Sequence, residues 1–166
     1  MSWKRRLLVT CLAVFVVLVP LTDTEATALA RVPFAMGPEG QSEDRTRGDC
    51  IHFGSDVGIE ALQMIKLGQC SIINNGNGTV TVTGSTAAYY PVEYLYVRLY
   101  LQRWDGSRWG DIKDWLDQAS TADYAYGSHT SSVTRGNYYR VRATHYAADG
   151  ALEEYAYSYS SSIYVE

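Results

Sequence analysis

The sequence predicts an all-β domain, an antiparallel β-sandwich of about seven strands. All 14 tyrosines lie between Tyr89 and Tyr164, and tyrosine favours the half-buried positions of a pleated sheet. Apolar and polar residues alternate in several segments with the two-residue period of a strand. Turn signals rich in glycine, asparagine and aspartate separate these segments at the short spacing that is typical of sandwiches and barrels.

Length and composition are those of a single domain. The chain has 166 residues, of which 46% are hydrophobic and 19% are charged, so it has enough apolar material for a core and too little charge for a disordered chain. The formal net charge is −4, without the basic excess of a nucleic-acid-binding protein. We therefore expect no nucleic acid among its partners.

Residues 1–30 have the pattern of a secretory signal peptide. Basic residues at positions 4–6 precede an apolar stretch, Leu7–Pro20, that is too short to span a bilayer as a helix. The A-x-A pattern allows cleavage after Ala30 or after Ala28. We expect a secreted, extracellular protein with no stable membrane span after cleavage.

The next segment, residues 31–49, is predicted to be a flexible N-terminal extension. It contains Pro33, Gly37, Pro38 and Gly40 in a run of polar and charged residues, which is typical of segments with little fixed structure. The sandwich domain is then expected to span residues 50–166.

Two cysteines, Cys50 and Cys70, remain after signal cleavage. In an oxidising compartment this pair predicts a disulfide, and the loop of about 21 residues that it closes is worth roughly 3 kcal/mol in the chain-entropy model. The alternative is two separate thiols. The spacing does not fit a zinc site, because no second cysteine pair or nearby histidine pair accompanies it.

The first strands are the least distinct in the sequence. An apolar stretch from Ile59 to Leu67 fits either a strand or a short helix, and periodicity does not decide between them. The Asn-Asn-Gly-Asn-Gly run at residues 74–78 predicts a turn. Residues 79–83 then alternate, with two valines on one face and three threonines on the other, which predicts a half-buried strand.

The strongest strand pattern runs from Glu93 to Arg103. One face is aliphatic and is expected in the core, and the other is aromatic and polar: Leu95, Val97, Leu99 and Leu101 against Tyr94, Tyr96, Arg98, Tyr100 and Gln102. The Asp-Gly pair at residues 105–106 turns the chain into a returning segment, residues 109–115.

The remaining segments complete the predicted domain. Residues 124–133 form a weaker strand, and a turn at residues 135–137 leads into a strand in which Tyr139, Val141 and Ala143 face the core. After a turn at residues 149–150, a strand rich in tyrosine and serine, residues 152–165, closes the domain.

Several of these segments together resemble a known family. They are Leu101-Gln102-Arg103 with Gly106, Trp109 and Trp115, the strand from Arg135 to Arg142 with His145 after it, the closing strand with Glu153 or Glu154 and residues 158–163, and the turn Gly84-Ser85-Thr86. Through them, residues from about Cys70 to Glu166 resemble a family of small secreted Gram-positive bacterial proteins of unknown function, domain of unknown function family 6147. The resemblance implies no catalytic residues.

The strand that begins at Tyr139 is also similar to a late strand of immunoglobulin-like and fibronectin III-like sandwiches. There an inward tyrosine near the start of the strand donates a hydrogen bond to the backbone at a corner, and Tyr139 is the equivalent residue here. This likeness implies an immunoglobulin-like or fibronectin III-like topology, and fold alone implies no function.

No motif of the mature chain predicts catalysis. Its three histidines, His52, His129 and His145, lack the spacing of a zinc enzyme, and we expect neither a metal nor a cofactor. His145 shares the parity of the core residue Tyr139, which predicts a structural role, and His129 is expected in a loop or at an edge.

The candidates for a small secreted hydrolase are paired carboxylates, Asp111, Asp114 and Asp117 or Glu153 and Glu154. Solvated surface acids are the commoner interpretation of such residues.

Two strands present tyrosines and arginines on the face opposite the core. If these strands are neighbours in one sheet, their outer faces form one ladder of candidate binding residues: Tyr94, Tyr96, Arg98, Tyr100, Tyr138, Arg140, Arg142 and Tyr146. Tyrosine and arginine concentrate at binding hot spots, and aromatic rings stack on sugars. The alternative is a structural role, because cross-strand aromatic pairs stabilise a sheet by roughly 0.2–1 kcal/mol each.

We therefore expect a secreted, non-catalytic module that binds a surface partner. A surface protein is the first expectation for this partner, and a cell-wall glycan is the alternative. A small secreted hydrolase that uses Asp or Glu is the alternative function.

Overall fold

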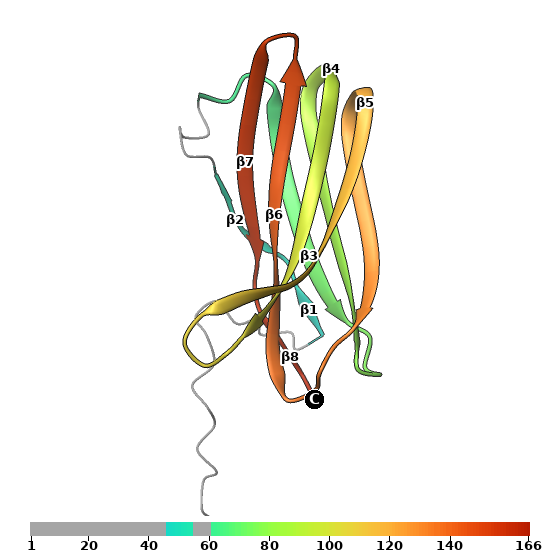
Figure 1. The fold of residues 1–166 in the computed structure, drawn as a ribbon, viewed down its shortest axis with the longest axis vertical. Helices are drawn as coiled ribbons and strands as arrows, with labels where there is room; N and C mark the ends of the chain where they lie inside the picture. The colour runs from blue at the N-terminus through green and yellow to red at the C-terminus, as the bar shows by residue number, and fades with distance from the viewer. Residues whose placement is uncertain (1–45, 55–60) are drawn as a thin grey trace, which may run out of the picture. The chain divides into compact units, whose positions relative to one another are not determined.

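A computed structural model describes residues 46–54 and 61–166 of the chain. These residues form eight strands of one antiparallel sheet (Figure 1): β1 Arg47–Gly48, β2 Cys50–Gly54, β3 Ile65–Asn74, β4 Thr79–Trp104, β5 Trp109–Ser132, β6 Asn137–Asp149, β7 Leu152–Ser160 and β8 Ile163–Val165. The predicted all-β antiparallel class is confirmed. No helix in these two ranges is long and apolar enough to cross a membrane.

The N-terminal predictions lie largely outside the described residues. This holds for the signal peptide, residues 1–30, and for the extension up to residue 45. The last residues of the predicted extension are ordered in the sheet, since β1 begins at Arg47 and pairs with β3.

The sheet is built around one long ribbon, β4 with β5, that bends in its middle. The first part of β4 pairs with β3 and the second part with β6, while β5 follows β4 along both parts. The register shifts between Ala87 and Val92 of β4, and nearby on β5 Thr121 has a φ of 52°. A left-handed backbone is uncommon for a β-branched residue and occurs here at the turn of the ribbon. The bend curls the sheet into a half-barrel.

The sequence predicts about seven strands in a sandwich, whereas the structure has eight strands hydrogen-bonded into one curled sheet. The two descriptions diverge within β4, where the sequence predicts one short strand at residues 79–83 and another from residue 93. The inward positions between them hold Gly84, Thr86 and Ala88, which are buried but too small or too polar to continue an apolar pattern. Gly84 fits a close approach, because a Cβ there would lie 2.5 Å from Cδ2 of Leu99.

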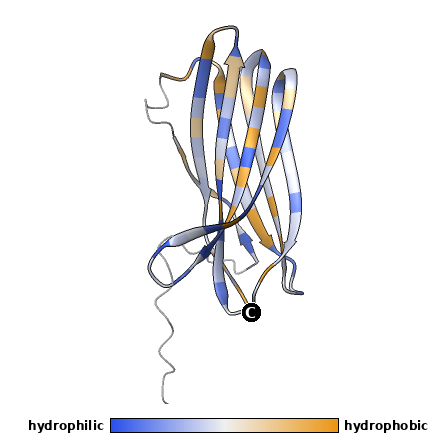
Figure 2. Ribbon diagram, viewed as in Figure 1, coloured by the Kyte–Doolittle hydropathy of each residue, from blue (hydrophilic) through white to orange (hydrophobic). Residues whose placement is uncertain are grey.

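Alternation along β4 and β6 places one face of each strand in the core. Figure 2 shows hydrophobic and hydrophilic residues alternating along β4. The predicted core face is confirmed, since its four side chains are all 0% exposed: Leu95, Val97, Leu99 and Leu101. Burying such a side chain contributes roughly 1.5–3 kcal/mol. The buried Tyr139 donates a hydrogen bond of 2.6 Å to the carbonyl of Thr134, which confirms the backbone contact predicted for this tyrosine.

A short N-terminal strap, residues 47–54, joins the two ends of the curled sheet. β1 pairs with β3, and β2 pairs with β7 (Figure 1). In the register of β2 with β7, Cys50 lies opposite Ser160. A Cβ on Gly48 would lie 2.3 Å from the carbonyl oxygen of Ser161, so only glycine fits where the strap crosses. The strap therefore bridges the seam between β3 and β7.

Candidate functional site

The outward surface of β4, β6 and β7 brings most of the predicted binding residues together. The register places Tyr96 opposite Tyr146 and Tyr100 opposite Arg142, so the two strands are neighbours, which is the condition for a single ladder. β7 adds three tyrosines that the sequence prediction omitted: Tyr155, Tyr157 and Tyr159. Small residues alternate with them, so the same two-residue period identifies them.

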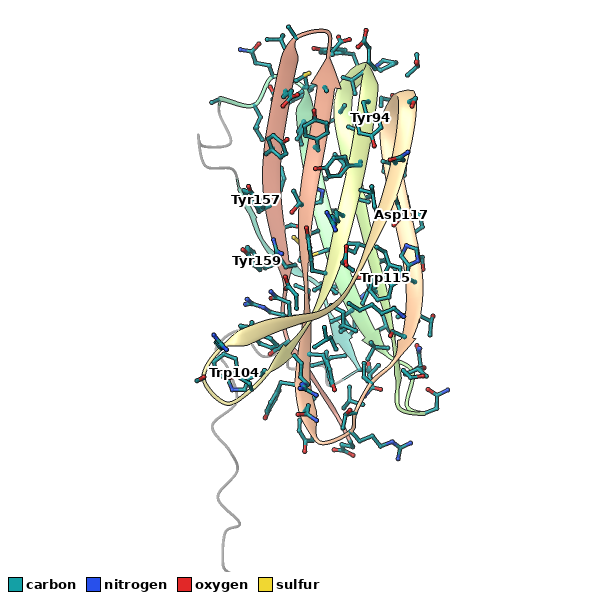
Figure 3. The ribbon with its side chains drawn as sticks, viewed as in Figure 1. Tyr94, Trp104, Trp115, Asp117, Tyr157 and Tyr159 are labelled. Atoms are coloured by element: carbon teal, nitrogen blue, oxygen red, sulfur yellow. The ribbon has the colours of Figure 1, made fainter. Side chains whose placement is uncertain are left out.

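We call this surface the aromatic–arginine face, and Figure 3 labels Tyr94, Tyr157 and Tyr159 on it. Its members are Tyr94, Tyr96, Arg98, Tyr100, Arg140, Arg142, Tyr146, Tyr155, Tyr157 and Tyr159. Tyr138, also predicted as a binding residue, is not in this set. It packs on Tyr164 of β8 with ring centroids 4.9 Å apart, at the end of β6 that pairs with β8 and lies beyond the β6 residues paired with β4.

Four tyrosines form the upper part of the face. The rings of Tyr96 and Tyr146 stack with centroids 4.8 Å apart, and Tyr94 meets both edge-on at 6.1 and 6.0 Å. Tyr155 lies against the other side of Tyr146 at 4.7 Å. Burial, followed by a hydrogen bond to Glu153, raises the pKa of Tyr146 to about 12. The phenol therefore stays protonated near neutral pH, and the ring faces are covered largely by other rings.

Arg98 and Arg142 both lie close to the Tyr100 ring. The Cζ of Arg142 is 3.8 Å from the ring centroid and that of Arg98 is 5.3 Å from it, both within the range of cation–π attraction. Arg98 also donates from Nε and Nη2 to Oδ2 of Asp114 at 2.9 and 2.6 Å. Neighbouring side chains thus hold both guanidinium groups in place.

Arg140 belongs to a network at the lower end of the face. Its Nε donates to Oε1 of Gln102 at 2.7 Å, and the Gln102 amide donates to Asp111 at 2.7 Å. The other Asp111 oxygen accepts from Arg142 at 3.1 Å. Burial lowers the pKa of Arg140, which still lies far above neutral because arginine is a very strong base.

The carboxylates considered for hydrolysis each have their own partners. Asp111 and Asp114 belong to the arginine contacts just described. Asp117 approaches His129 of the same strand, with Oδ2 2.7 Å from Nε2, and the His129 ring stacks on Trp115 at a centroid distance of 5.2 Å (Figure 3). The contacts of Asp117 therefore differ from those of Asp111 and Asp114.

Glu154 has an anchoring role that the sequence does not reveal. Its carboxylate accepts hydrogen bonds from the main-chain N–H groups of Gln63, Met64 and Ile65 at 2.6, 2.8 and 2.9 Å. Hydrogen bonds to a charged acceptor are stronger than neutral ones. Glu154, which lies on β7, therefore attaches to β7 the segment that leads into β3.

His145 is 0% exposed in the core, as its parity predicts. Nδ1 lies 2.8 Å from Oγ1 of Thr86, and Nε2 lies 2.8 Å from Oγ of Ser158. Because the Thr86 hydroxyl donates to the carbonyl of Tyr96 at 2.8 Å, it accepts from Nδ1–H, and Nε2 accepts from Ser158. Burial lowers the pKa of His145 to about 3. This hydroxyl–imidazole pair is closed to solvent, which indicates a structural role.

A second surface is hollowed by a cleft of about 360 Å³ where the strap meets β3, β4 and β5. Gln69, Ser85 and Tyr126 are register partners on the adjacent strands β3, β4 and β5, and they line the cleft together with Tyr124. Tyr124 and Tyr126 are 54% and 55% exposed. Within the described part of the chain, none of these four side chains makes a hydrogen bond. The sequence did not predict the cleft, because its walls come from segments far apart in the chain.

Both cysteines line this cleft. Cys70 is 3% exposed and Cys50 is half-buried. A hydrogen bond between their side chains, together with burial, raises the pKa of the Cys70 thiol well above its usual range. The structure thus brings together the two residues of the predicted disulfide, although no disulfide bond joins these two described residues in it.

Comparison with known proteins identifies a family whose function is unknown. Residues 46–161 match the model of a family that is described as a family of unknown function, DUF6147. No curated protein matches the chain, and no solved structure matches it.

Proposed function

The chain belongs to the DUF6147 family of unknown function, and we propose from its own residues that it is an exported, non-catalytic module that binds a surface protein through the aromatic–arginine face. Export rests on the signal peptide expected at residues 1–30. A Gram-positive origin and an immunoglobulin-like or fibronectin III-like relationship are parts of the same proposal and rest on sequence resemblance.

The observation that carries this proposal is the register of β4, β6 and β7, which gathers seven tyrosines and three arginines on one surface. Tyrosine and arginine are the residues that most often dominate the binding energy of protein interfaces. The side chains are held by stacking and ion pairs, so a partner orders few of them on binding, and this lowers the entropic cost of association.

The packing of the rings favours a protein over a glycan on this face. A sugar needs an open ring face on which to stack. Here the Tyr96 and Tyr146 faces are covered by each other and Tyr155 lies against Tyr146. What remains outward are ring edges, hydroxyl groups and guanidinium groups, which suit the backbone carbonyls and carboxylates of a protein surface.

The test separates binding from a structural role by using exposed members of the face. Surface proteins are cross-linked to the immobilised parent, and the Kd of the purified partner is measured by biolayer interferometry. Arg98→Ala combined with Tyr155→Ala should weaken binding by about tenfold or more without loss of fold, because both side chains are about half exposed. Tyr126→Ala, at the cleft, is the control and should bind normally. Equal affinity of the double variant and the parent refutes the proposal.

A glycan is the second candidate partner, and the cleft is the feature that favours it. Half-exposed tyrosine rings beside hydroxyl and amide groups that have no hydrogen bonds within the described residues are the chemistry that a neutral saccharide needs. Retention of the parent on peptidoglycan or a glycan array, abolished by Tyr126→Ser and retained by Tyr155→Ser, would support this site. If the parent is retained on neither material, the proposal of a glycan site in the cleft is refuted.

A small secreted hydrolase that uses Asp or Glu is the alternative that we place last. Asp114, Asp117 and Glu154 each have a separate partner, whereas a glycosidase needs two carboxylates on either side of one bond. A screen of the parent against a broad set of hydrolase substrates tests this alternative. Turnover that persists when the protein is purified to homogeneity would support hydrolysis.

A further inference from the structure

At the seam of the curled sheet, β3 and β7 are not paired with each other, and the strap bridges them. Only the two residues of β1 pair with β3 there, while β2 pairs with β7 on the other side. Between them, the main-chain N–H of Ser161 donates to the carbonyl of Asp49 at 2.8 Å. The strap therefore depends on a short run of backbone hydrogen bonds.

The two cysteines lie at this crossing. Cys50 begins β2 and pairs with Ser160 of β7, whereas Cys70 lies within β3 opposite Gly84. Their side chains are in hydrogen-bond contact and line the same cleft, so the sulfurs approach each other across the seam.

We propose that Cys50 and Cys70 form a disulfide that fastens the strap to β3 and closes the seam covalently. This inference is independent of the proposed binding function. It also differs from a disulfide read from the compartment alone, because it assigns the bond a position, across the open ends of the sheet, and a structural effect.

The oxidation is balanced by a dithiol–disulfide exchange. The Cys50 thiolate attacks the disulfide of an exported thiol–disulfide oxidoreductase and forms a mixed disulfide. The Cys70 thiolate then displaces the oxidoreductase sulfur, so two S–H bonds are lost, one S–S bond forms, and the oxidoreductase leaves as a dithiol with both electrons and both protons. Cys50 is the sulfur that the oxidant reaches first because it is the more exposed of the two.

The first test is the mass of the protein after oxidation. The chain without its signal segment is purified without reductant and incubated with oxidised glutathione as the disulfide oxidant. The intact mass should fall by two hydrogens relative to the reduced protein, and a digest should contain Cys50 and Cys70 in one linked peptide. Two thiols that are both alkylated by iodoacetamide after denaturation of the oxidised sample would overturn the proposal.

The second test asks whether the bond acts at the seam. Reduction should lower the melting temperature by about 10 °C, given the loop that the bond closes. Cys50→Ser, at the more exposed position, should melt near the reduced parent and should not respond to reductant. Cys70→Ser should likewise not respond to reductant, and it should lose additional stability because the substitution lies at a buried position. A Cys50→Ser protein that still loses the full 10 °C on reduction would overturn the proposal.

Discussion

Lowering the pH from 7 to about 5 is expected to destabilise the fold through the buried imidazole of His145. In the folded state its pKa lies at about 3, and in the unfolded chain it returns to about 6.5. The unfolded state therefore takes up a proton at a pH where the folded state does not. The contribution of this group to stability is complete above about pH 6.5 and is lost as the pH falls towards 3.

The size of the effect follows from the difference between the two pKa values. Each pH unit below about 6.5 removes about 1.4 kcal/mol, so the loss is about 2 kcal/mol at pH 5. That is a substantial part of the 5–15 kcal/mol that stabilises an ordinary domain. Two features of the site explain why the folded state resists the proton. Nε2 already accepts from Ser158, and Gly68 packs so closely that a Cβ there would lie 2.3 Å from Cδ2 of the ring.

The assay is urea unfolding at pH 7, 6 and 5, followed by tryptophan fluorescence. His145→Gln removes the titration, so between pH 7 and 5 the variant should lose about 2 kcal/mol less stability than the parent. The comparison uses the slope with pH, because the substitution also changes the stability at pH 7. His129→Gln is the matched control, because His129 is half-buried and pairs with Asp117. This variant should keep the dependence of the unfolding free energy on pH that His145 causes. An identical slope in His145→Gln and the parent refutes the reasoning.

Three further predictions concern stability and use chemical denaturation. Leu99→Ala should cost about 2–5 kcal/mol, because the side chain is fully buried against the inner face of the other part of β4, and an unchanged midpoint would mean that the register is wrong. Glu154→Gln should cost about 1–2 kcal/mol and speed hydrogen exchange at residues 63–65, whereas unchanged exchange there would argue against the anchoring role. Thr121→Gly should stabilise the domain by up to about 1 kcal/mol by relieving the left-handed backbone, and a loss of stability would show that the threonine side chain matters more.

The sequence predicts the strands whose two faces differ strongly in polarity. The second part of β4 and the start of β6 were predicted with the correct inward residues, because Leu99 and Val141 alternate with charged or aromatic neighbours. β5 was the weaker prediction, since most of its residues are exposed and its only strand neighbour among the described elements is β4. The continuity of β4 was missed because Gly84 and Thr86 are buried without being apolar.

In the candidate sites, too, the sequence predicts only what a local pattern along one strand reveals. The ladder of tyrosines and arginines was found because each strand displays it with a period of two, and only Tyr138 lies apart from it. The tyrosines of β7 carry the same signal, and Tyr157 was predictable on that basis. The cleft, the Glu154 anchor and the strap were not predictable, because each depends on contacts between distant segments. For the strap the local signal is a single glycine, Gly48.

The strap also constrains the order in which the protein folds. It is the first part of the domain to leave the ribosome, yet β2 pairs with β7, which is made near the end of the chain. The strap must therefore wait until nearly the whole domain has been synthesised before it docks. Contacts of such long sequence separation form slowly, because the loop between them must close first. During that interval the edges of β3 and β7 carry unpaired main-chain groups on which a strand of a second chain can pair, so the seam is then open to domain swapping and aggregation.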